Sequence, residues 1–466
     1  MWDLLIRNGT VVTAHGEFLE DVAVAGGKIA RRSLHGTLSG PAEQIVDATG
    51  SLVMPGVIDA HNHLPLGEGS GVHPWRVNSI AAAHGGITTL LDFARSNRGN
   101  SVAEAVKIRR AEADPNVAID YALHFQFADW PLPEPDVMAS VKAAGISSVK
   151  VFMNNWRFGC AMGDGQLYDI FRKAAVADLT VGLHAENQPL IDYLTEELKK
   201  SGKTGVEWFP QSRRAIVEVE AVTRAITLAR ATGTRLYFFH ITAAQSVDAI
   251  RLARQEGLPI FAETCPHYLL FDDSVYGLEF EKAIRFIRFP ALKSAKDREA
   301  LWSGLRDETL SVLGTDHVPV YWASKLEQSQ GRPFYELPGG MALNELFLNS
   351  MYSHGVAAGK IDLKKLVACL TENPARVFGL YPRKGTLEIG SDADIVLFDP
   401  HTRWTVTADQ LHMDSDYSIH EGEELQGRVR ATILRGKLIV KDGAYVGQPG
   451  EGMYLCRNHS PLQHLH

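Results

Sequence analysis

Apolar and polar positions follow two different patterns along this chain. Residues 1–54 contain short apolar runs separated by turn residues, for example residues 22–24 before a Gly-Gly pair. Such runs predict short β-strands. From Pro55 onward, apolar runs alternate with longer Ala-, Glu- and Arg-rich stretches of helical spacing. Strands that alternate with helices predict βα units and a parallel sheet.

The middle of the chain contains eight such apolar runs, the number that closes a (β/α)₈ barrel. They are 56–61, 87–93, 119–124, 148–152, 180–184, 235–240, 259–263 and 310–316. After Leu380 strand-like runs return, and we expect them to pair with the N-terminal strands. We therefore predict an α/β fold with a (β/α)₈ TIM barrel and a small β-sandwich domain formed from both chain ends. The predicted parts are the barrel at 55–380, the sandwich at 1–54 and 381–456, and a C-terminal tail at 457–466.

Composition and charge exclude several classes of protein. The chain has 466 residues, is 45% hydrophobic, and carries 47 Lys+Arg against 55 Asp+Glu, a formal net charge of −8. These values argue against a disordered chain and a basic nucleic-acid binder. Four separated cysteines indicate neither a disulfide framework nor a zinc ribbon. With no signal-peptide pattern and no uncharged apolar stretch of about 18 residues, we expect a cytoplasmic protein without nucleic-acid or membrane partners.

The first barrel run ends in His61 and His63, which are separated by one residue. Residues i and i+2 of a strand project to the same face, so both imidazoles can reach one metal ion at the barrel mouth. An isolated pair of this kind occurs often by chance. Polar residues that can serve a metal site recur, however, where later runs end: Lys150, His184, His240 and Asp316. Because barrel active sites form at the C-terminal ends of the strands, this recurrence predicts a metal centre.

Lys150 needs a separate explanation, because an ammonium group has no lone pair and repels metal ions. A buried, neutral lysine can react with carbon dioxide to form a carbamate, whose two anionic oxygens can bridge two ions. The alternative is an ordinary ion pair between Lys150 and a nearby acid.

Taken in order, the motifs of the chain resemble those of the cyclic amidohydrolases, which include hydantoinases, dihydropyrimidinases, allantoinases and dihydroorotases. The similar segments span nearly the whole chain: 56–63, 85–89, 145–150, 184–187, 263–269, 314–317, 373–375 and 384–396. The segment 416–422 and the strand after it resemble hydantoinases and dihydropyrimidinases more than dihydroorotases.

The resemblance implies a binuclear metal centre, with zinc as the first choice of ion from the types of ligand. The implied ligands are His61, His63 and Asp316 for one ion, His184 and His240 for the other, and carboxylated Lys150 as the bridge. Asp316 would also be the catalytic base and acid. By family analogy we expect a homo-oligomer, a tetramer.

Three positions depart from the hydantoinase pattern in segments expected to bind the substrate. Asn155 lies where many hydantoinases have a nearby tyrosine, Phe289 replaces a serine, and Gly340 belongs to a Pro-Gly-Gly sequence where Asn-Gly is common. We expect the metal chemistry to be retained and substrate recognition to be altered. Trp156, Phe158 and Phe289 favour an apolar or aromatic ring substituent, unless they only pack a lid.

These observations predict a metal-dependent cyclic amidohydrolase of the hydantoinase or dihydropyrimidinase type. It would open a hydantoin or dihydropyrimidine ring to give an N-carbamoyl amino acid. Allantoinase or cyclic-imide hydrolase is the alternative activity, with dihydroorotase ranked below them. The non-enzymatic alternative, an inactive dihydropyrimidinase-like scaffold, is disfavoured because all six expected ligands are present.

Overall fold

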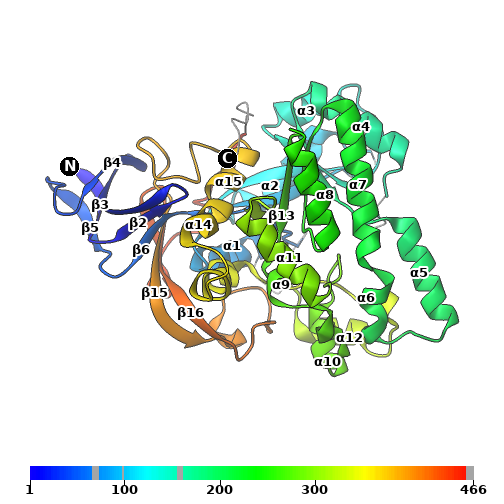
Figure 1. Ribbon diagram of the computed structural model, residues 1–466. Coiled ribbons are helices and arrows are strands. Elements are labelled where there is room, and N and C mark those ends of the chain that lie inside the picture. The colour runs from blue at the N-terminus through cyan, green and yellow to red at the C-terminus, as the bar shows by residue number, and fades with distance from the viewer. Residues whose placement is uncertain (66–72, 97–98, 155–160, 458–466) are drawn as a thin grey trace.

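Eight parallel strands form the centre of the molecule in the computed structural model, which describes residues 1–65, 73–96, 99–154 and 161–457 (Figure 1). They are β7 (Val57–Asp59), β8 (Ile87–Arg95), β9 (Asp120–Gln126), β10 (Ser148–Phe152), β11 (Thr180–His184), β12 (Arg235–Phe238), β13 (Ile260–Thr264) and β14 (Val312–Leu313). They pair in chain order, and each coincides with one of the predicted runs. The predicted (β/α)₈ barrel is therefore confirmed.

Helices cover the outside of the barrel and connect its strands. They are α1 (Pro74–His84), α2 (Val102–Ala113), α3 (Val137–Ala143), α4 (Asp164–Val176), α5 (Gln188–Lys200), α6 (Phe209–Ser212), α7 (Ala215–Thr232), α8 (Ala244–Gln255), α9 (Pro266–Leu270), α10 (Phe280–Ala283), α11 (Ala295–Arg306), α12 (Trp322–Ser329), α13 (Phe347–Met351), α14 (Leu363–Leu370) and α15 (Glu372–Val377). Every residue of β9, β10, β11 and β13 is buried. Burial on both faces is what a helix-covered parallel sheet requires, and it explains why these runs are continuously apolar.

Alternating residues of the barrel strands belong to two apolar clusters. In β12, Phe238 packs with the outer helices, whereas Tyr237 belongs to a cluster with Phe93, Phe239 and Phe378. Successive strand residues point to opposite faces, so this second cluster fills the barrel interior.

The barrel closes between β7 and β14 just beyond the ends of these strands. The Asp316 amide donates a hydrogen bond to the His61 carbonyl at 2.8 Å, and the His63 amide donates to the His317 carbonyl at 2.9 Å. A parallel bridge also joins Asn62 and His317. The closing seam therefore brings together two predicted ligand segments that are about as far apart in sequence as the barrel allows.

The predicted β-sandwich contains ten strands from both chain ends, which lie side by side next to the barrel in Figure 1. They are β1 (Trp2–Arg7), β2 (Thr10–Thr13), β3 (Gly16–Ala25), β4 (Lys28–Leu34), β5 (Ala42–Asp47), β6 (Leu52–Pro55), β15 (Ile395–Thr405), β16 (Glu424–Leu434), β17 (Lys437–Lys441) and β18 (Ala444–Tyr445). Antiparallel pairing of β6 with β15 joins the two ends. Leu4, Val22, Leu397 and Ile433 share one buried core.

We expected the sandwich to end at residue 456 and a tail to begin at residue 457, but the residues on both sides of this boundary contact the barrel. The Leu455 amide donates to the Tyr121 carbonyl at 2.8 Å, and the Arg457 amide donates to the Gly145 carbonyl at 2.8 Å. Leu455 and Arg457 are both buried. Leu455 and Arg457, at the end of this segment, therefore pack against the barrel, and Leu455 joins the apolar cluster of the barrel interior. Residues 458–466 lie outside the described residues.

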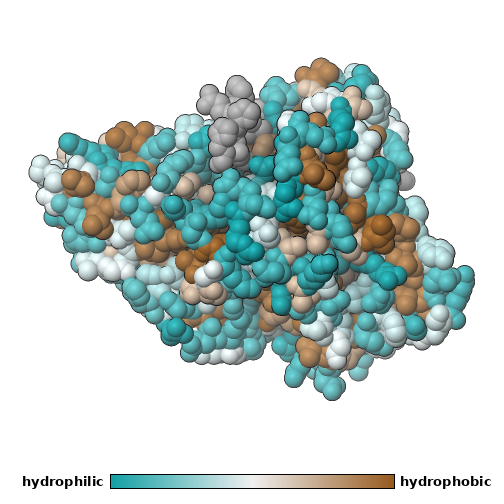
Figure 2. Space-filling view, in the orientation of Figure 1, coloured by the Kyte–Doolittle hydropathy of each residue, from teal (hydrophilic) through white to brown (hydrophobic). Residues whose placement is uncertain are grey.

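The face of the molecule in Figure 2 is mainly hydrophilic, and its apolar residues gather only in small groups. Within the four described ranges, we found no helix with the length and apolar character needed to span a membrane.

Candidate metal centre

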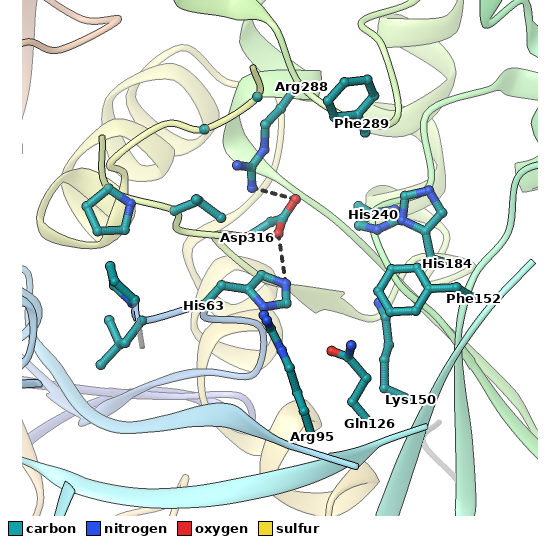
Figure 3. A pocket seen from close by; sticks show the side chains of 16 residues that line it. His63, Arg95, Gln126, Lys150, Phe152, His184, His240, Arg288, Phe289 and Asp316 are labelled. Atoms are coloured by element: carbon teal, nitrogen blue, oxygen red, sulfur yellow. Dashed lines mark ion pairs between the residues drawn. The ribbon is translucent and has the colours of Figure 1, made fainter. Parts of the chain in front are cut away.

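Three predicted ligand atoms converge at the closing seam of the barrel. His61 Nε2 lies 3.1 Å from His63 Nε2. Asp316 Oδ1 lies 3.3 Å from the His61 nitrogen and 3.4 Å from the His63 nitrogen. Figure 3 shows the contact between His63 and Asp316 as a dashed line. The two imidazole nitrogens and the carboxylate oxygen lie close together. This set of donor atoms suits a divalent cation.

The other two predicted histidines lie next to this set. The His184 and His240 rings are 4.5 Å apart between centroids, and the His61 and His240 rings are 5.4 Å apart. Ligand atoms of His61, His240 and Asp316 all lie within 4.8 Å of one another. The fold thus gathers all five predicted histidine and aspartate ligands, which come from the ends of β7, β11, β12 and β14.

Lys150 projects from β10 into the same site and is 1% exposed. Its Nζ lies 3.5 Å from the centroid of the Phe239 ring and 5.1 Å from that of Phe152. Among the described residues, no carboxylate lies within ion-pair distance of Nζ, so the ordinary ion pair considered above is not formed there. Burial lowers the pKa of Lys150 to about 7, against the raising effect of Asp316 and Glu263. Burial thus favours the neutral amine, whereas the face of the Phe239 ring next to Nζ attracts the charged form.

Burial also keeps the histidines of the site neutral. It holds the pKa of His61, His63 and His240 well below the ordinary value, and the positive charge of Lys150 acts in the same direction. Only neutral imidazole presents the nitrogen lone pair that a metal ion needs. The residues present therefore suit divalent metal ions both in geometry and in protonation state.

Glu263, at the end of β13, supports His61 and was assigned no role from the sequence. Its Oε1 accepts a hydrogen bond from His61 Nδ1 at 2.5 Å, and its Oε2 accepts one from the Tyr237 hydroxyl at 2.6 Å. Burial raises the pKa of Glu263 to about 8, and the Tyr237 hydrogen bond opposes that rise. With Nδ1 as the donor, the lone pair of His61 is on Nε2, which faces the ligand cluster.

Glu186 supports His184 in a similar way. Its Oε2 accepts hydrogen bonds from His184 Nε2 at 2.7 Å and from Arg213 Nη1 at 2.7 Å. Asn154 Nδ2 donates to the same oxygen at 3.0 Å. Burial raises the pKa of Glu186, but Arg213 and His184 outweigh it and lower the pKa to about 2. In the tautomer with Nε2 protonated, the lone pair of His184 is on Nδ1.

The backbone is unusual at two of the predicted ligands. His240 has φ of 40° and Asp316 has φ of 50°, in the left-handed region that non-glycine residues rarely adopt. Such conformations cost about 1–3 kcal/mol and persist where the surrounding structure enforces them, often at functional sites. The Asp316 amide is held by its hydrogen bond to the His61 carbonyl. The strained backbone thus aims both side chains into the barrel mouth.

A cavity of about 430 Å³ opens over these residues. Of the three predicted substrate-binding residues, Phe289 and Gly340 line it. Asn155 lies outside the described residues, as do Trp156 and Phe158.

Two arginines that the sequence analysis did not single out also line the cavity, Arg95 and Arg288. Arg288 Nη2 lies 2.5 Å from Asp316 Oδ2 (Figure 3). Arg95 is the last residue of β8, and a charged residue at the C-terminal end of a barrel strand is a sequence signal that could have identified it as a site residue. Arg288 follows a short 3₁₀ turn, Ile284–Phe286, where no periodic pattern marks it.

Comparison with known proteins agrees with this geometry. The amidohydrolase family model matches residues 52–439. A D-hydantoinase from Streptomyces coelicolor is 36% identical over 97% of this chain and 97% of its own, and one from Ralstonia pickettii is 37% identical over 98% and 99%. A D-phenylhydantoinase from Escherichia coli is 32% identical over 97% and 98%.

Solved structures show the same similarity. A dihydropyrimidinase from Brevibacillus agri superposes with a TM-score of 0.91 at 32% identity, covering 98% of each chain. An L-hydantoinase from Arthrobacter aurescens has a TM-score of 0.88 at 28% identity, covering 98% of this chain and all of its own. The family model and the relatives cover the barrel, the sandwich and the candidate centre together, and the chain therefore belongs to the amidohydrolase family.

Proposed function

We propose that this protein is a binuclear-metal hydrolase that opens the cyclic amide bond of a hydantoin or dihydropyrimidine and yields an N-carbamoyl amino acid. The observation that carries the proposal is the convergence of the predicted ligands in one cavity at the barrel mouth. Relatives named as hydantoinases, which match this chain over nearly its full length, support the choice of reaction.

The proposed metal-binding residues are those implied by the sequence. They are His61, His63 and Asp316 for one ion, His184 and His240 for the other, and Lys150, carboxylated, between them. Two divalent ions, with zinc as the first choice, would supply an activated water and would polarise the ring carbonyl.

Asp316 is the proposed catalytic base and acid. It takes a proton from the attacking water and returns it to the ring nitrogen as the carbon–nitrogen bond breaks, so that one water is added across that bond. Its Oδ2 is held by Arg288 and its Oδ1 faces the histidines, which fixes the carboxylate over the reacting groups. Phe289 and Gly340 would form walls of the substrate site. Asn155 is proposed to donate to the substrate carbonyl.

A substrate panel tests this function. The protein, reconstituted with Zn²⁺, Mn²⁺ or Co²⁺, is expected to convert hydantoin or dihydrouracil to the N-carbamoyl product. Asp316→Asn should bind substrate with little change in KM while kcat falls by about 10²–10⁴-fold, the usual contribution of a positioned acid or base. Turnover of allantoin or succinimide alone would favour the alternative activity. A metal-loaded protein that opens none of these rings would overturn the proposal.

By family analogy we also propose a homotetramer. The four separated cysteines support the proposal of a cytoplasmic location. Light scattering on the purified protein tests the subunit number, and a dominant monomer would overturn that part of the proposal.

A further inference from the structure

The cavity contains more positive charge than an uncharged ring requires. Among the described residues that line it, Asp316 is the only carboxylate, whereas two side chains, Arg95 and Arg288, are guanidinium cations. In Figure 3, Arg288 points to Asp316 and Arg95 reaches toward His63 from the other side. A cleft with a surplus of one charge sign in low-dielectric walls concentrates ligands of the opposite sign.

Acidic groups behind the cavity wall are already engaged by other partners. Asp92 accepts hydrogen bonds from Arg109 at 2.8 and 2.9 Å. Glu186 accepts from Arg213 and His184, and Glu263 accepts from His61 and Tyr237. Among the described residues, Asp316 is therefore the only carboxylate that lines the cavity, and it contacts Arg288.

Arg288 is the best placed of these basic groups for binding an anion. It is 4% exposed, and its guanidinium contacts Asp316 through Nη2. Its Nε is buried and has no hydrogen-bond partner among the described residues. A guanidinium has five N–H donors in a rigid fork, and leaving a buried donor unpaired costs free energy. One ion pair thus leaves donors of Arg288 for a second acceptor, and a carboxylate matches the fork best.

We propose that the substrate is a cyclic amide whose ring substituent carries a carboxylate, and that Arg288 binds this carboxylate while Arg95 adds a second positive charge. The inference rests on the function proposed above and deepens it by naming the substrate class. Phe289, which follows Arg288 in the chain, gives the same cavity an apolar wall. The apolar or aromatic substituent expected from Trp156, Phe158 and Phe289 in the sequence is the rival outcome.

Binding of a matched pair of stable ligands tests the proposal without turnover. The probes are 2-oxoimidazolidine-4-carboxylate and its carboxamide, which have the same shape and differ in charge. For the rival outcome the probe is 4-phenylimidazolidin-2-one, which lacks the ring carbonyl at which a hydantoin is opened. Calorimetry on the full-length, metal-loaded protein should show the carboxylate bound at least about tenfold tighter than the carboxamide, as expected for charged hydrogen bonds.

Variants assign this preference to the arginines. Arg288→Met should reduce it to less than about threefold, and Arg288→Lys, which keeps the charge but loses the fork, should give an intermediate value. Arg95→Met should reduce it in part. Arg285→Met is the matched control, because Arg285 lies three residues earlier, stacks on Trp322 at 4.7 Å and does not line the cavity. This control should keep the full preference.

Equal binding of the two probes by the wild type, or a preference that survives in Arg288→Met, would overturn the inference. Tighter binding of 4-phenylimidazolidin-2-one than of the carboxylate probe, by a ratio that does not change in Arg288→Met, would also overturn it. Parallel turnover of hydantoin-5-acetate and hydantoin-5-acetamide separates the two proposals. Turnover of both at equal kcat/KM contradicts the anionic substrate and leaves ring hydrolysis standing. Carboxylate binding through Arg288 without turnover of any ring supports the anion site and contradicts the proposed reaction.

Discussion

At the residue scale, the site depends on a few side chains whose protonation is set by their surroundings. His61 and His184 each donate a hydrogen bond from one ring N–H to a buried glutamate, which leaves the lone pair on the other ring nitrogen. Lys150 has aromatic rings instead of an acid around Nζ. Each group is therefore prepared for a cation or for carboxylation before any ligand binds.

Lys150→Ala is expected to lose metal and activity together, because the proposed anionic bridge between the two ions is removed. Acetate or propionate should restore part of the activity by occupying the vacated space. Elemental analysis and turnover measure both effects, and the native mass of the wild type at neutral pH should include one added CO₂. Lys107→Ala, on the exposed side of α2, is the control. A variant with full metal content and full activity would contradict the bridging role.

Glu263→Gln is expected to weaken metal binding by about 10–100-fold, since the carboxylate that orients His61 becomes an amide. Competition with a chelator measures the affinity. Glu196→Gln, an exposed position on α5, provides the comparison and should not differ from the wild type. Unchanged affinity in Glu263→Gln would show that His61 is held by other contacts.

At the scale of elements, the packing of two neighbouring strands around Lys150 requires a glycine at position 182. Gly182 in β11 pairs in register with Lys150 in β10. A Cβ on Gly182 would lie 2.2 Å from the Phe239 ring, the same ring that covers Lys150 Nζ. A side chain at this position would displace Phe239, so the barrel interior and the lysine environment depend on each other.

Gly182→Ala is expected to lower the free energy of unfolding by about 1–3 kcal/mol, the usual cost of overpacking a core. Metal content should fall as well, because the displaced Phe239 ring is the one that contacts Lys150 Nζ. Gly165→Ala in α4 is the matched control, since its Cβ would meet no atom within 4 Å. Alanine is favoured over glycine inside helices by about 0.5–1 kcal/mol, so the control should be neutral or slightly stabilised. Urea unfolding compares both variants, and equal stability would contradict the packing argument.

At the scale of the whole molecule, a buried lysine connects the barrel with the sandwich. Lys384 Nζ lies 2.5 Å from Asp120 Oδ2, at the start of barrel strand β9, and 2.6 Å from Asp394 Oδ2, just before sandwich strand β15. Asp392 Oδ2 lies 3.0 Å away. The sequence indicated this segment only as a family motif, and the structure shows that its charges join the two parts.

Lys384→Met should lower the free energy of unfolding by about 3–5 kcal/mol, because it leaves buried carboxylates without their shared cation. Lys437→Met removes a lysine whose side chain is 74% exposed and pairs with Glu451, so its effect should be below about 1 kcal/mol. Denaturant unfolding distinguishes them. Similar losses in the two variants would show that the buried cluster does not hold the domains together.

Acidification should weaken the same cluster. Burial raises the pKa of Asp392, but Lys384, Lys28 and Arg383 outweigh it and lower the pKa to about 2. Since the folded-state pKa is below the unfolded value of about 4, this stabilisation is present above about pH 4 and is lost as the pH falls toward 2. Urea unfolding at pH 5 and pH 3 should show a larger loss for the wild type than for Asp392→Asn. An equal loss would contradict the depressed pKa.

The sequence by itself determined the barrel strands and the candidate ligands. Continuous apolar runs specify buried parallel strands locally, and polar residues at their ends are visible without knowing which strands become neighbours. For that reason β6 and β15 could be predicted as parts of one domain. The residues that could be predicted as members of one site are His61, His63, Lys150, His184, His240 and Asp316.

Only the tertiary structure decided which groups complete the site. Glu263 meets His61 across about 200 residues of chain, and Arg288 comes from an irregular segment in which no period marks a side chain. The left-handed backbone of His240 and Asp316, and the docking of Leu455 and Arg457 on the barrel, arise from barrel closure and packing. Local patterns specify elements, but contacts between distant segments exist only after the elements have packed, and those contacts set the charge and the orientation of the groups in the cavity.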